Sequence, residues 1–474
     1  MGENVFTGED EDVDVTEHFD VVVLGGGPGG YGAALYGAAA GLNIALVEAE
    51  KVGGTCLHRG CIPAKELLQT AEVLRTVRGA KDFGIQVGEP TLDLPASMAR
   101  KQQVIDKLTK GLESLLAGRN VTVFPGVGSI VAASAQRVTV AGTELTGDAL
   151  ILATGSTPRV LPGIEFDGER ILSSDHVLEL DRVPQRTAII GGGAIGCEFA
   201  SYLADVGSAV TILEALPAIL PGVDPQAADV VARAFRRRGI KVLTNVRVEG
   251  VDGESCPTVN YTLDGNGVSL EVDAVIICVG RSPRSEGIQI EAPEIALGIG
   301  GHVVVDAHMR TTIPNVYAVG DLVDTPALAH VGFAEAIVAI KDILGEEAKP
   351  IDYDKVPWGI YCHPEVAFSG LTEADARERG YDVVTSVHRF GGNSRAILMG
   401  ETDGLVKIVA ERDGPILGVH FAGPWATELL AEGYLAVSWE ATAADIGALI
   451  HAHPTLSELF GESAMALTGR GLHG

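Results

Sequence analysis

The sequence is short of cysteine, of positive charge and of long apolar runs. Only six of its 474 residues are cysteine, too few for a disulfide framework in a chain of this length, which favours a reducing compartment, the cytoplasm. Lysine and arginine number 35 against 63 acidic residues, and the net charge of −28 argues against nucleic acid or an anionic membrane as a partner. No apolar run reaches membrane-spanning length without glycine or charge interruptions, so no membrane segment is expected.

Residues 1–19 also lack the features of a signal peptide, since they contain acidic clusters and neither a basic start nor an apolar core. We interpret them as a disordered tail. Cys197, Cys256, Cys278 and Cys362 are scattered singly, without the clustered spacing of zinc ligands. No metal site is therefore expected.

Two other cysteines do lie close together, in the stretch GGTCLHRGCIPAK. On an ideal helix the Cα atoms of Cys56 and Cys61 would lie roughly 8–9 Å apart, whereas a disulfide needs less than about 7 Å. Gly60 permits the local unwinding that would let the pair close. Such a disulfide would be strained and easily reduced, as catalytic disulfides are, and Lys65 would favour the thiolate form. The alternatives are two free thiols or half of a metal site, but a metal site would need a second cluster of ligands, which the sequence does not supply.

A first nucleotide-binding pattern follows a short apolar strand at residues 20–24. Gly25 would make the tight turn, Gly27 would admit a pyrophosphate, and Gly30 would let the next helix pack on the strand. A second strand ends at Glu48, 23 residues after the first glycine, where it would accept hydrogen bonds from the adenosine ribose. A lone glycine pattern is a weak signal, but here strand, helix, second strand and acid are all in register.

A second pattern of the same kind begins at Gly191 and continues through Gly193 and Gly196. Its acid, Glu214, again lies 23 residues after the first glycine. Two complete units imply two dinucleotides, or one dinucleotide and a degenerate copy. No arginine occurs in residues 215–224, which disfavours a 2′-phosphate and predicts NAD rather than NADP at the second site.

Two further segments would meet the first dinucleotide. The tripeptide at residues 154–156 follows a buried strand, and its small residues would let the backbone approach a cofactor. Asp321 comes at the end of a short strand over 316–319, where a carboxylate would meet a ligand hydroxyl, and a helix beginning near His330 would present its N-terminus. A flavin ribityl chain is the favoured partner of Asp321, which by itself could equally be a helix cap.

From about residue 349 the pattern changes to alternating strands and short helices without glycine fingerprints, which is typical of an α+β domain. In its stretch HAHPTLSE, Glu458 follows His453 and could fix the tautomer and orientation of a histidine base. Pro454 restricts the backbone of His453. On the local sequence alone, a surface turn followed by a capped helix is the favoured interpretation.

Taken together, these motifs resemble the flavin-dependent pyridine nucleotide–disulfide oxidoreductases, over about residues 20–470. The resemblance is greatest to the members that oxidise protein-bound dihydrolipoamide with NAD⁺, giving lipoamide and NADH. Its most specific parts are GGTCLHRGCIPAK (53–65), GGGAIGCE (191–198), NVYAVGD (315–321), ALAH (327–330) and HAHPTLSE (451–458). It implies FAD and NAD as cofactors.

The resemblance also implies catalytic roles for six residues. Cys56 would be the interchange thiol and Cys61 the charge-transfer thiol of a redox-active disulfide, while Lys65 and Glu198 would form an ion pair beside the flavin. His453, held by Glu458, would be the acid–base and would act in the site of the partner subunit, which implies a homodimer.

The cofactor sites implied by the motifs and the resemblance are larger sets. For FAD they are Gly25, Gly27, Gly30, Glu48, Gly54, Thr55, Lys65, Gly126, Thr154, Gly155, Ser156, Asp321, Ala327, Leu328, Ala329 and His330. For NAD they are Gly191, Gly193, Ile195, Gly196, Glu198, Glu214, Val248 and Gly280.

The expected fold is α/β, with two dinucleotide-binding Rossmann-like domains and a C-terminal α+β dimerisation domain. After the tail at 1–19, we expect the first part of the FAD-binding domain at 20–152 and the NAD-binding domain at 153–280. The chain would return to the FAD-binding, central domain at 281–348 and end in the interface domain at 349–474.

His58, Arg59 and Trp425 depart from the commoner pattern of the family and put in doubt which disulfide fits the pocket. A related flavoprotein reductase of another disulfide or of quinones is therefore an alternative, and a non-catalytic redox sensor is a weaker one. No lipoyl module precedes residue 20, so the expected partner is a lipoyl-bearing carrier protein of a 2-oxo acid dehydrogenase or glycine cleavage complex.

Overall fold

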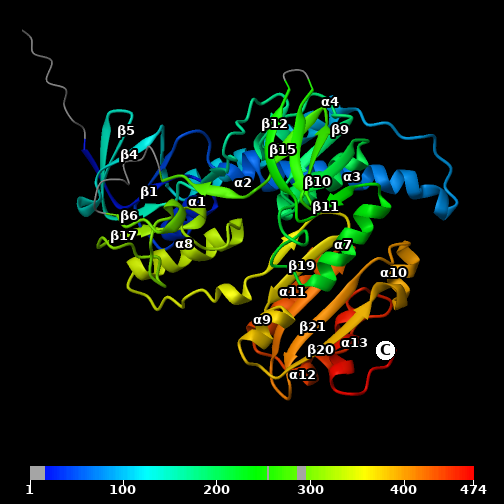
Figure 1. Cartoon of the computed structure of the whole chain (residues 1–474). Coiled ribbons are helices and arrows are strands. Elements are labelled where there is room, and N and C mark those ends of the chain that lie inside the picture. The colour runs from blue at the N-terminus through cyan, green and yellow to red at the C-terminus, as the bar shows by residue number, and fades with distance from the viewer. Residues whose placement is uncertain (1–15, 254–255, 286–294, 474) are drawn as a thin grey trace, which may run out of the picture. The chain divides into compact units, whose positions relative to one another are not determined.

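The computed structural model describes residues 16–253, 256–285 and 295–473 (Figure 1). The chain divides into two compact units. Unit 1 comprises Met1–His58, Asp106–Thr157 and Ser282–Ile351, and unit 2 comprises Arg59–Ile105, Pro158–Arg281 and Asp352–Gly474. The elements that cross from one unit to the other along the chain are α2 (Gly54–Arg59), α4 (Leu94–Gly118), β7 (Ser156–Pro158) and β16 (Arg281–Pro283).

Unit 1 is built on one seven-stranded sheet in the order β3-β2-β1-β6-β5-β4, with β17 paired to β6. Its strands are β1 (Thr16–Leu24), β2 (Ile44–Glu48), β3 (Thr122–Pro125), β4 (Gly128–Ala132), β5 (Arg137–Val140), β6 (Thr143–Leu152) and β17 (Val316–Ala318). Strands β3, β2, β1, β6 and β17 are mutually parallel, as a dinucleotide-binding sheet requires.

The central strand β1 is buried on both faces. Val21 and Val23 pack with α1 (Pro28–Ala39) and α8 (Ala329–Ile343), while Val22 and Leu24 pack into a second cluster formed with β5 and β6. Alternate residues therefore serve opposite faces, which explains the continuous apolar run. Helices α1 and α8 lie side by side (Figure 1).

The predicted tail is only partly described. Acidic residues 9–14 lie outside the described residues. Strand β1 begins at Thr16 and pairs with β6 from that residue onward. The prediction of disorder is therefore wrong for residues 16–19, whose backbone forms the first part of the ladder between β1 and β6.

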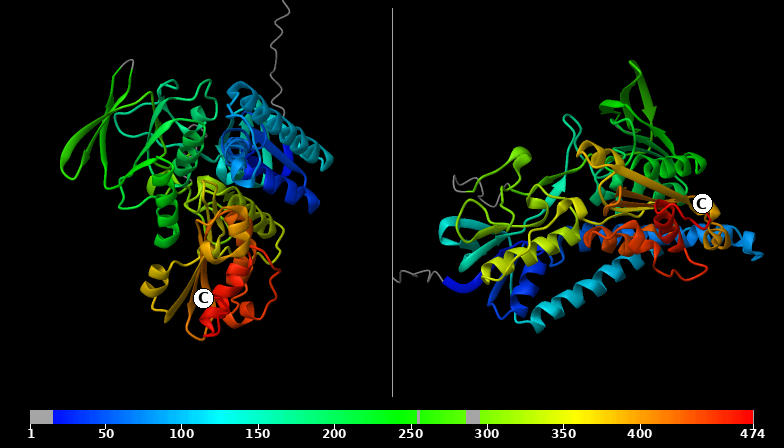
Figure 2. Two further views of the ribbon diagram at one scale, coloured as in Figure 1. Left: turned by 90° about the vertical axis from the view of Figure 1, so that its right-hand side faces the viewer. Right: turned by 90° about the horizontal axis from the view of Figure 1, so that it is seen from below.

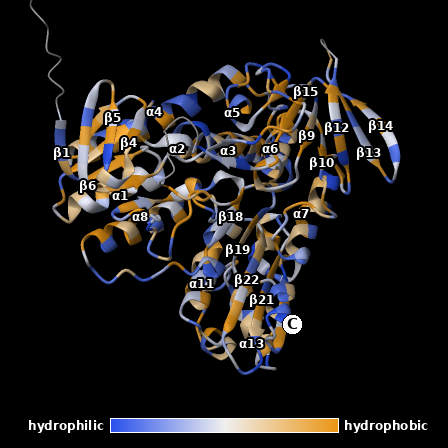
Figure 3. Ribbon diagram, turned by 60° about the vertical axis from the view of Figure 1, so that its left-hand side comes forward, coloured by the Kyte–Doolittle hydropathy of each residue, from blue (hydrophilic) through white to orange (hydrophobic). Residues whose placement is uncertain are grey.

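The first part of unit 2 contains a five-stranded parallel sheet in the order β11-β10-β9-β15-β8 and an antiparallel sheet in the order β12-β13-β14. Its elements are α3 (Cys61–Gly79), β8 (Ile171–Leu172), α5 (Ser174–Val177), β9 (Arg186–Ile190), α6 (Ala194–Asp205), β10 (Ala209–Leu213), α7 (Pro225–Arg237), β11 (Lys241–Leu243), β12 (Arg247–Asp252), β13 (Thr258–Leu263), β14 (Asn266–Glu271) and β15 (Ala274–Ile277). Strands β9, β10 and β15 are largely hydrophobic, as Figure 3 shows, because both faces of the parallel sheet are covered.

The C-terminal part of unit 2 is an antiparallel sheet in the order β18-β19-β22-β21-β20. Its elements are β18 (Trp358–Ile360), β19 (Glu365–Gly370), α9 (Glu373–Glu378), β20 (Val383–Arg389), α10 (Ser394–Met399), β21 (Leu405–Glu411), β22 (Ile416–Gly423), α11 (Ala426–Ser438), α12 (Ala443–Gly447) and α13 (Glu458–Leu467). Helices α11 and α13 pack on this sheet, as Figure 2 shows.

The predicted fold class is confirmed, since a mixed sheet with five parallel strands and a fully parallel sheet, each with a glycine loop, precede an antiparallel α+β part. The predicted domain boundaries remain predictions. Among the described residues, no helix is both long and apolar enough to cross a membrane.

Candidate active site

The first glycine loop is shaped by close backbone contacts within unit 1. Gly25 has a φ of +105°, and a Cβ atom there would lie 2.3 Å from the carbonyl oxygen of Ala153. A Cβ atom at Gly30 would lie 1.7 Å from the carbonyl oxygen of Gly25. Gly27 begins α1, and no side chain caps the helix. The first-turn N–H groups are therefore suited to the pyrophosphate of a dinucleotide.

Glu48 closes this loop from the end of β2. Its carboxylate accepts hydrogen bonds from the N–H groups of Gly26 at 2.6 Å and Glu50 at 2.8 Å. Its carbonyl oxygen accepts one from Gly126 N–H at 2.9 Å. Each carboxylate oxygen has a second lone pair, so the group fits a ribose diol as well as the loop.

The stretch GGTCLHRGCIPAK (53–65), called the redox stretch below after its predicted role, begins against the same loop. The N–H of Gly53 donates to the carbonyl oxygen of Gly26 at 2.7 Å. Gly54 has a φ of +55°, and a Cβ atom there would lie 2.6 Å from the Cα of Gly27. Thr55 is the next residue in α2. These glycines therefore bring the start of the redox stretch to the predicted pyrophosphate position.

Asp321 and the tripeptide at 154–156 meet in unit 1. The hydroxyl of Ser156 donates to Asp321 Oδ2 at 2.5 Å, and Thr154 Oγ1 donates to the carbonyl oxygen of Arg284 at 2.7 Å. Asp321 lies inside the short 3₁₀ helix Gly320–Leu322, which has no side-chain cap. The alternative interpretation of Asp321 as a helix cap is therefore not supported.

Helix α8 adds a residue that the sequence did not single out. Glu335 is fully buried and accepts hydrogen bonds from Gly320 N–H at 2.6 Å and Thr325 Oγ1 at 2.7 Å. It thereby fixes the segment that contains Asp321 to α8. Ala327 and Leu328 precede α8, and Leu328 begins it without a side-chain cap. A carboxylate within the Ala-rich run of α8 was the only signal that could have identified Glu335.

Helix α8 can approach the first loop because glycine faces glycine. A Cβ atom at Gly332 would lie 3.3 Å from the nitrogen of Gly29. Larger residues at this crossing would separate the helix N-termini that begin at Gly27 and Leu328.

The second glycine loop, in unit 2, repeats the geometry of the first. A Cβ atom at Gly191 would lie 2.4 Å from the carbonyl oxygen of Cys278, and one at Gly196 would lie 2.0 Å from that of Gly191. Gly193 begins α6 without a side-chain cap and has open space around it. Glu214 accepts hydrogen bonds from Gly192 N–H at 2.5 Å and Leu216 N–H at 2.8 Å. This loop therefore fits a second dinucleotide.

The remaining predicted NAD residues are less closely tied to the loop. Val248 lies in β12 and pairs with Tyr261, although Val246, two residues earlier, donates to the carbonyl oxygen of Glu214 at 2.9 Å. Gly280, with a φ of +111°, follows β15 and accepts a hydrogen bond from Arg159 N–H at 3.0 Å. Ile195 lies in the first turn of α6.

Lys65 and Glu198 form an ion pair within unit 2. Lys65 Nζ lies 2.7 Å from Glu198 Oε2 and 3.0 Å from Oε1. Burial alone would lower the pKa of Lys65, but the charge and hydrogen bonds of Glu198 outweigh it and raise that pKa. Lys65 is therefore held as a cation.

Tyr361 contacts both members of this ion pair, and the sequence did not identify it. Its main-chain N–H donates to Glu198 Oε1 at 2.9 Å, and its ring centroid lies 4.8 Å from Lys65 Nζ. No local spacing links Tyr361 to Lys65, because the contact depends on how the C-terminal sheet packs on α6.

The two cysteines lie on either side of a helix break. Cys56 is in α2, Cys61 begins α3, and both are half-buried. Between the two helices Gly60 has φ −148° and ψ −111°, outside the helical region. The predicted local unwinding at Gly60 is confirmed. His58 Nε2 donates to the carbonyl oxygen of Val52 at 2.9 Å, which ties this stretch to the preceding loop.

His453 and Glu458 form the predicted pair in the C-terminal part of unit 2. His453 Nδ1 lies 2.8 Å from Glu458 Oε1. The other carboxylate oxygen accepts a hydrogen bond from Thr455 N–H at 2.8 Å. Burial alone would raise the pKa of Glu458, but the hydrogen bonds from Thr455 and His453 lower it. The carboxylate therefore stays ionised, and the imidazole is oriented with Nε2 away from it.

The predicted site residues are thus divided between the units. Those assigned to FAD lie in unit 1, apart from Lys65. Those assigned to NAD, together with Lys65, Glu198, His453 and Glu458, lie in unit 2. Cys56 and Cys61 are joined by the chain segment that passes from unit 1 to unit 2.

Comparison with known proteins relates this arrangement to one family. Residues 19–336 match the pyridine nucleotide-disulphide oxidoreductase family, and residues 356–464 match its dimerisation domain. The second match supports a homodimer.

Similar curated proteins and solved structures agree. Dihydrolipoyl dehydrogenase of Bacillus subtilis is 39% identical over 470 residues, 96% of this chain and 99% of that protein. Dihydrolipoyl dehydrogenase of Chlamydia muridarum is 40% identical over 465 residues, 97% of this chain and 99% of that protein. The crystal structure of LpdA from Mycobacterium tuberculosis superposes with a TM-score of 0.88 at 27% identity, covering 96% of this chain and 99% of that one. The chain therefore belongs to the pyridine nucleotide-disulphide oxidoreductase family.

Proposed function

We propose that this chain oxidises dihydrolipoamide with NAD⁺, as a dihydrolipoyl dehydrogenase that uses FAD and a Cys56–Cys61 disulfide. The observation that carries this proposal is the helix break at Gly60, which places the two cysteines in separate helices of one redox stretch. The predicted cofactors agree with the family, since the matched domains bind dinucleotides and the relatives are dihydrolipoyl dehydrogenases.

The first half of the reaction is a thiol–disulfide exchange. His453, oriented by Glu458, takes a proton from one thiol of dihydrolipoamide. The thiolate attacks the sulfur of Cys56, the Cys56–Cys61 bond breaks, and Cys61 leaves as a thiolate. The second thiol of the substrate then attacks the mixed disulfide, which releases lipoamide and leaves both cysteines reduced. Electrons and protons balance, because one dithiol is oxidised as one disulfide is reduced.

In the second half of the reaction the electron pair passes from the reduced cysteines to NAD⁺. FAD, when bound, supplies the hydride chemistry between the reduced cysteines and the nicotinamide. The chain contributes orientation through the two glycine loops and a fixed positive charge through Lys65, whose partner Glu198 lies on the helix that begins at the second loop.

We also propose the biological setting. The working form is a homodimer in which His453 of one subunit serves the cysteines of the other. The substrate is the lipoyl group of a carrier protein from a 2-oxo acid dehydrogenase or glycine cleavage complex. A reducing cytoplasmic location fits the absence of a disulfide framework among six cysteines.

Steady-state kinetics test the proposal. The holoenzyme should reduce NAD⁺ with dihydrolipoamide at least about tenfold faster, in kcat/KM, than with low-molecular-weight dithiols, and should prefer NAD⁺ to NADP⁺. The alternative is a related flavoprotein reductase of another disulfide or of quinones. A structure of the HOCl-induced flavoprotein disulfide reductase RclA of Escherichia coli, which superposes with a TM-score of 0.83 at 28% identity, supports a disulfide substrate for this alternative. Preferential turnover of another disulfide or a quinone would favour that alternative.

A further inference from the structure

The loop that contains the predicted base has a largely buried side chain just before that base. Residues 448–457 join α12 to α13, and most of this loop is solvent-exposed. Ile450 is 100% exposed and the His453 side chain 71% exposed, whereas the side chain of His451, between them, is only 11% exposed. His451 is therefore the point at which this loop is anchored ahead of His453.

Two helices hold the His451 ring. Its Nε2 lies 2.9 Å from Oε1 of Glu432, in the middle of α11. A carboxylate only accepts, so Nε2 carries the proton and donates it. On the other side, the ring lies against Gly461 of α13, where a Cβ atom would be 2.5 Å from Nδ1 and 2.6 Å from Cε1. Glycine is needed at this position because any larger residue would displace the ring.

The far side of His453 is also fixed. Thr455 N–H donates to Glu458 Oε2 at 2.8 Å, and Asn393 Nδ2 donates to the carbonyl oxygen of Thr455 at 2.9 Å. His453 is thus suspended between an anchor two residues before it and another two residues after it. Removing the first anchor would leave the pair with Glu458 intact but free the backbone on one side of the ring.

We propose that His451, seated by Glu432 and Gly461, is a positioning residue that holds His453 at the distance from its substrate that proton removal requires. This inference rests on the proposed function. The contacts of His451 with Glu432 and Gly461 act by fixing the position of the ring, since Glu432 needs only to accept a hydrogen bond from His451. Misplacement of a reacting group by about 1 Å can lower a rate substantially, by as much as 10²-fold.

Three variants of the holoenzyme test whether the contacts of His451 position His453. Glu432→Ala removes the acceptor, Glu432→Gln keeps an acceptor without the charge, and Gly461→Ala displaces the ring while both titratable groups remain. Gly111→Ala is the matched control, since Gly111 lies within α4 with open space around it. For each variant we would measure kcat and KM for dihydrolipoamide, and also NADH-dependent ferricyanide reduction, which does not use His453.

Glu432→Ala and Gly461→Ala should each lower kcat about tenfold with KM for dihydrolipoamide nearly unchanged. Glu432→Gln should restore most of kcat, Gly111→Ala should match the parent enzyme, and ferricyanide reduction should be unaffected throughout. The inference is overturned if Glu432→Gln is as slow as Glu432→Ala, if both disruptive variants keep full kcat, or if they lose ferricyanide reduction as well. Absence of dihydrolipoamide turnover in the parent enzyme would instead refute the proposed function, and this inference with it.

Discussion

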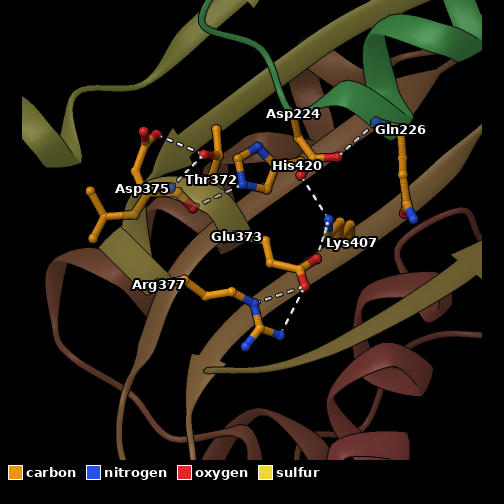
Figure 4. Close-up of polar contacts among 9 residues, drawn as sticks. Asp224, Gln226, Thr372, Glu373, Asp375, Arg377, Lys407 and His420 are labelled. Atoms are coloured by element: carbon orange, nitrogen blue, oxygen red, sulfur yellow. Dashed lines mark hydrogen bonds and ion pairs between the residues drawn. The ribbon is translucent and has the colours of Figure 1, made fainter. Parts of the chain in front are cut away.

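Replacement of Lys407 by methionine should lower the free energy of unfolding of the C-terminal part of unit 2. Lys407 lies in β21 with only 3% of its side chain exposed, and its Nζ lies 2.8 Å from Asp224 Oδ2 and 2.9 Å from Glu373 Oε2 (Figure 4). Asp224 begins α7 and accepts a hydrogen bond from Gln226 N–H at 3.0 Å. Lys407 therefore connects the sheet to two other elements, α7 and α9, through one buried cation.

The magnitude follows from what is left behind. Methionine fills about the same space as lysine, so the change creates little cavity. It does leave Asp224, whose side chain is fully buried, without a cation. Removal of one partner from a buried ion pair destabilises by about 3–5 kcal/mol. Because Asp224 keeps its hydrogen bond to Gln226, we expect the lower end, ~3 kcal/mol.

A double variant isolates the charge. Lys407→Met combined with Asp224→Asn leaves no buried charge at the position of Asp224, and asparagine still caps a helix well. We expect the double variant to recover at least about half of the stability lost by Lys407→Met alone. Equal or greater loss would mean that packing of the lysine stem, rather than its charge, is what matters.

The pH dependence has a defined sign. Hydrogen bonds from Lys407 and Arg377 lower the pKa of Glu373, against the opposing effect of burial. A carboxylate whose pKa is lowered on folding stabilises the protein at pH values above its ordinary pKa. This contribution is lost as the pH falls through the folded-state pKa. Because the pKa of Glu373 lies below its ordinary value of 4.5 in the folded protein, the stability difference between the parent protein and Lys407→Met should stay nearly constant from pH 7 to about pH 5 and narrow as the pH falls below about 4.5.

Urea unfolding followed by tryptophan fluorescence, at a fixed excess of FAD, measures these differences as shifts of the transition midpoint. FAD is held constant because a ligand that binds only the folded state adds stability of its own. A loss of under about 1 kcal/mol for Lys407→Met, or a difference that widens in acid, would refute the reasoning.

Three further predictions follow from the two units and the net charge. Glu214→Ala should lower kcat/KM for NAD⁺ about tenfold, equivalent to ~1.4 kcal/mol, without changing KM for dihydrolipoamide, as NAD⁺ titrations would show. Glu198→Gln should lower the pKa of Lys65, because burial then acts without the opposing carboxylate; kcat should fall about tenfold while FAD stays bound, as kinetics and absorbance would show. The net charge of −28 implies self-repulsion, so raising NaCl from low to high concentration should raise the melting temperature by about 4 °C, and a fall would contradict this.

The glycine loops were predictable because their requirements are local. Gly25, Gly30 and Glu48 belong to one continuous strand–helix–strand segment, and the fold confirms the close contacts expected of it. The break at Gly60 was predictable for a similar reason, since the reach of a disulfide and the geometry of a helix conflict over a short stretch.

Residues recruited by tertiary packing were not predictable in this way. Tyr361 meets Glu198, and Glu432 meets His451, only because separate helices and sheets pack together. Glu335 could be noticed as a charge in an apolar helix, but its partners Gly320 and Thr325 depend on a turn that sequence periodicity does not describe. Trp425 adopts a left-handed conformation with a φ of +57°, which glycine would adopt more easily, and nothing in the local sequence indicates it.

The most direct test of the central claim is an anaerobic titration of the purified protein with dihydrolipoamide, followed by visible absorbance and compared with Cys56→Ser. We predict a yellow protein that develops a long-wavelength thiolate-to-flavin band on titration, and a variant that keeps its flavin but no longer turns over dihydrolipoamide with NAD⁺. A colourless protein, or a Cys56→Ser variant that keeps this activity, would contradict the claim that a cysteine pair passes electrons between a dithiol and NAD.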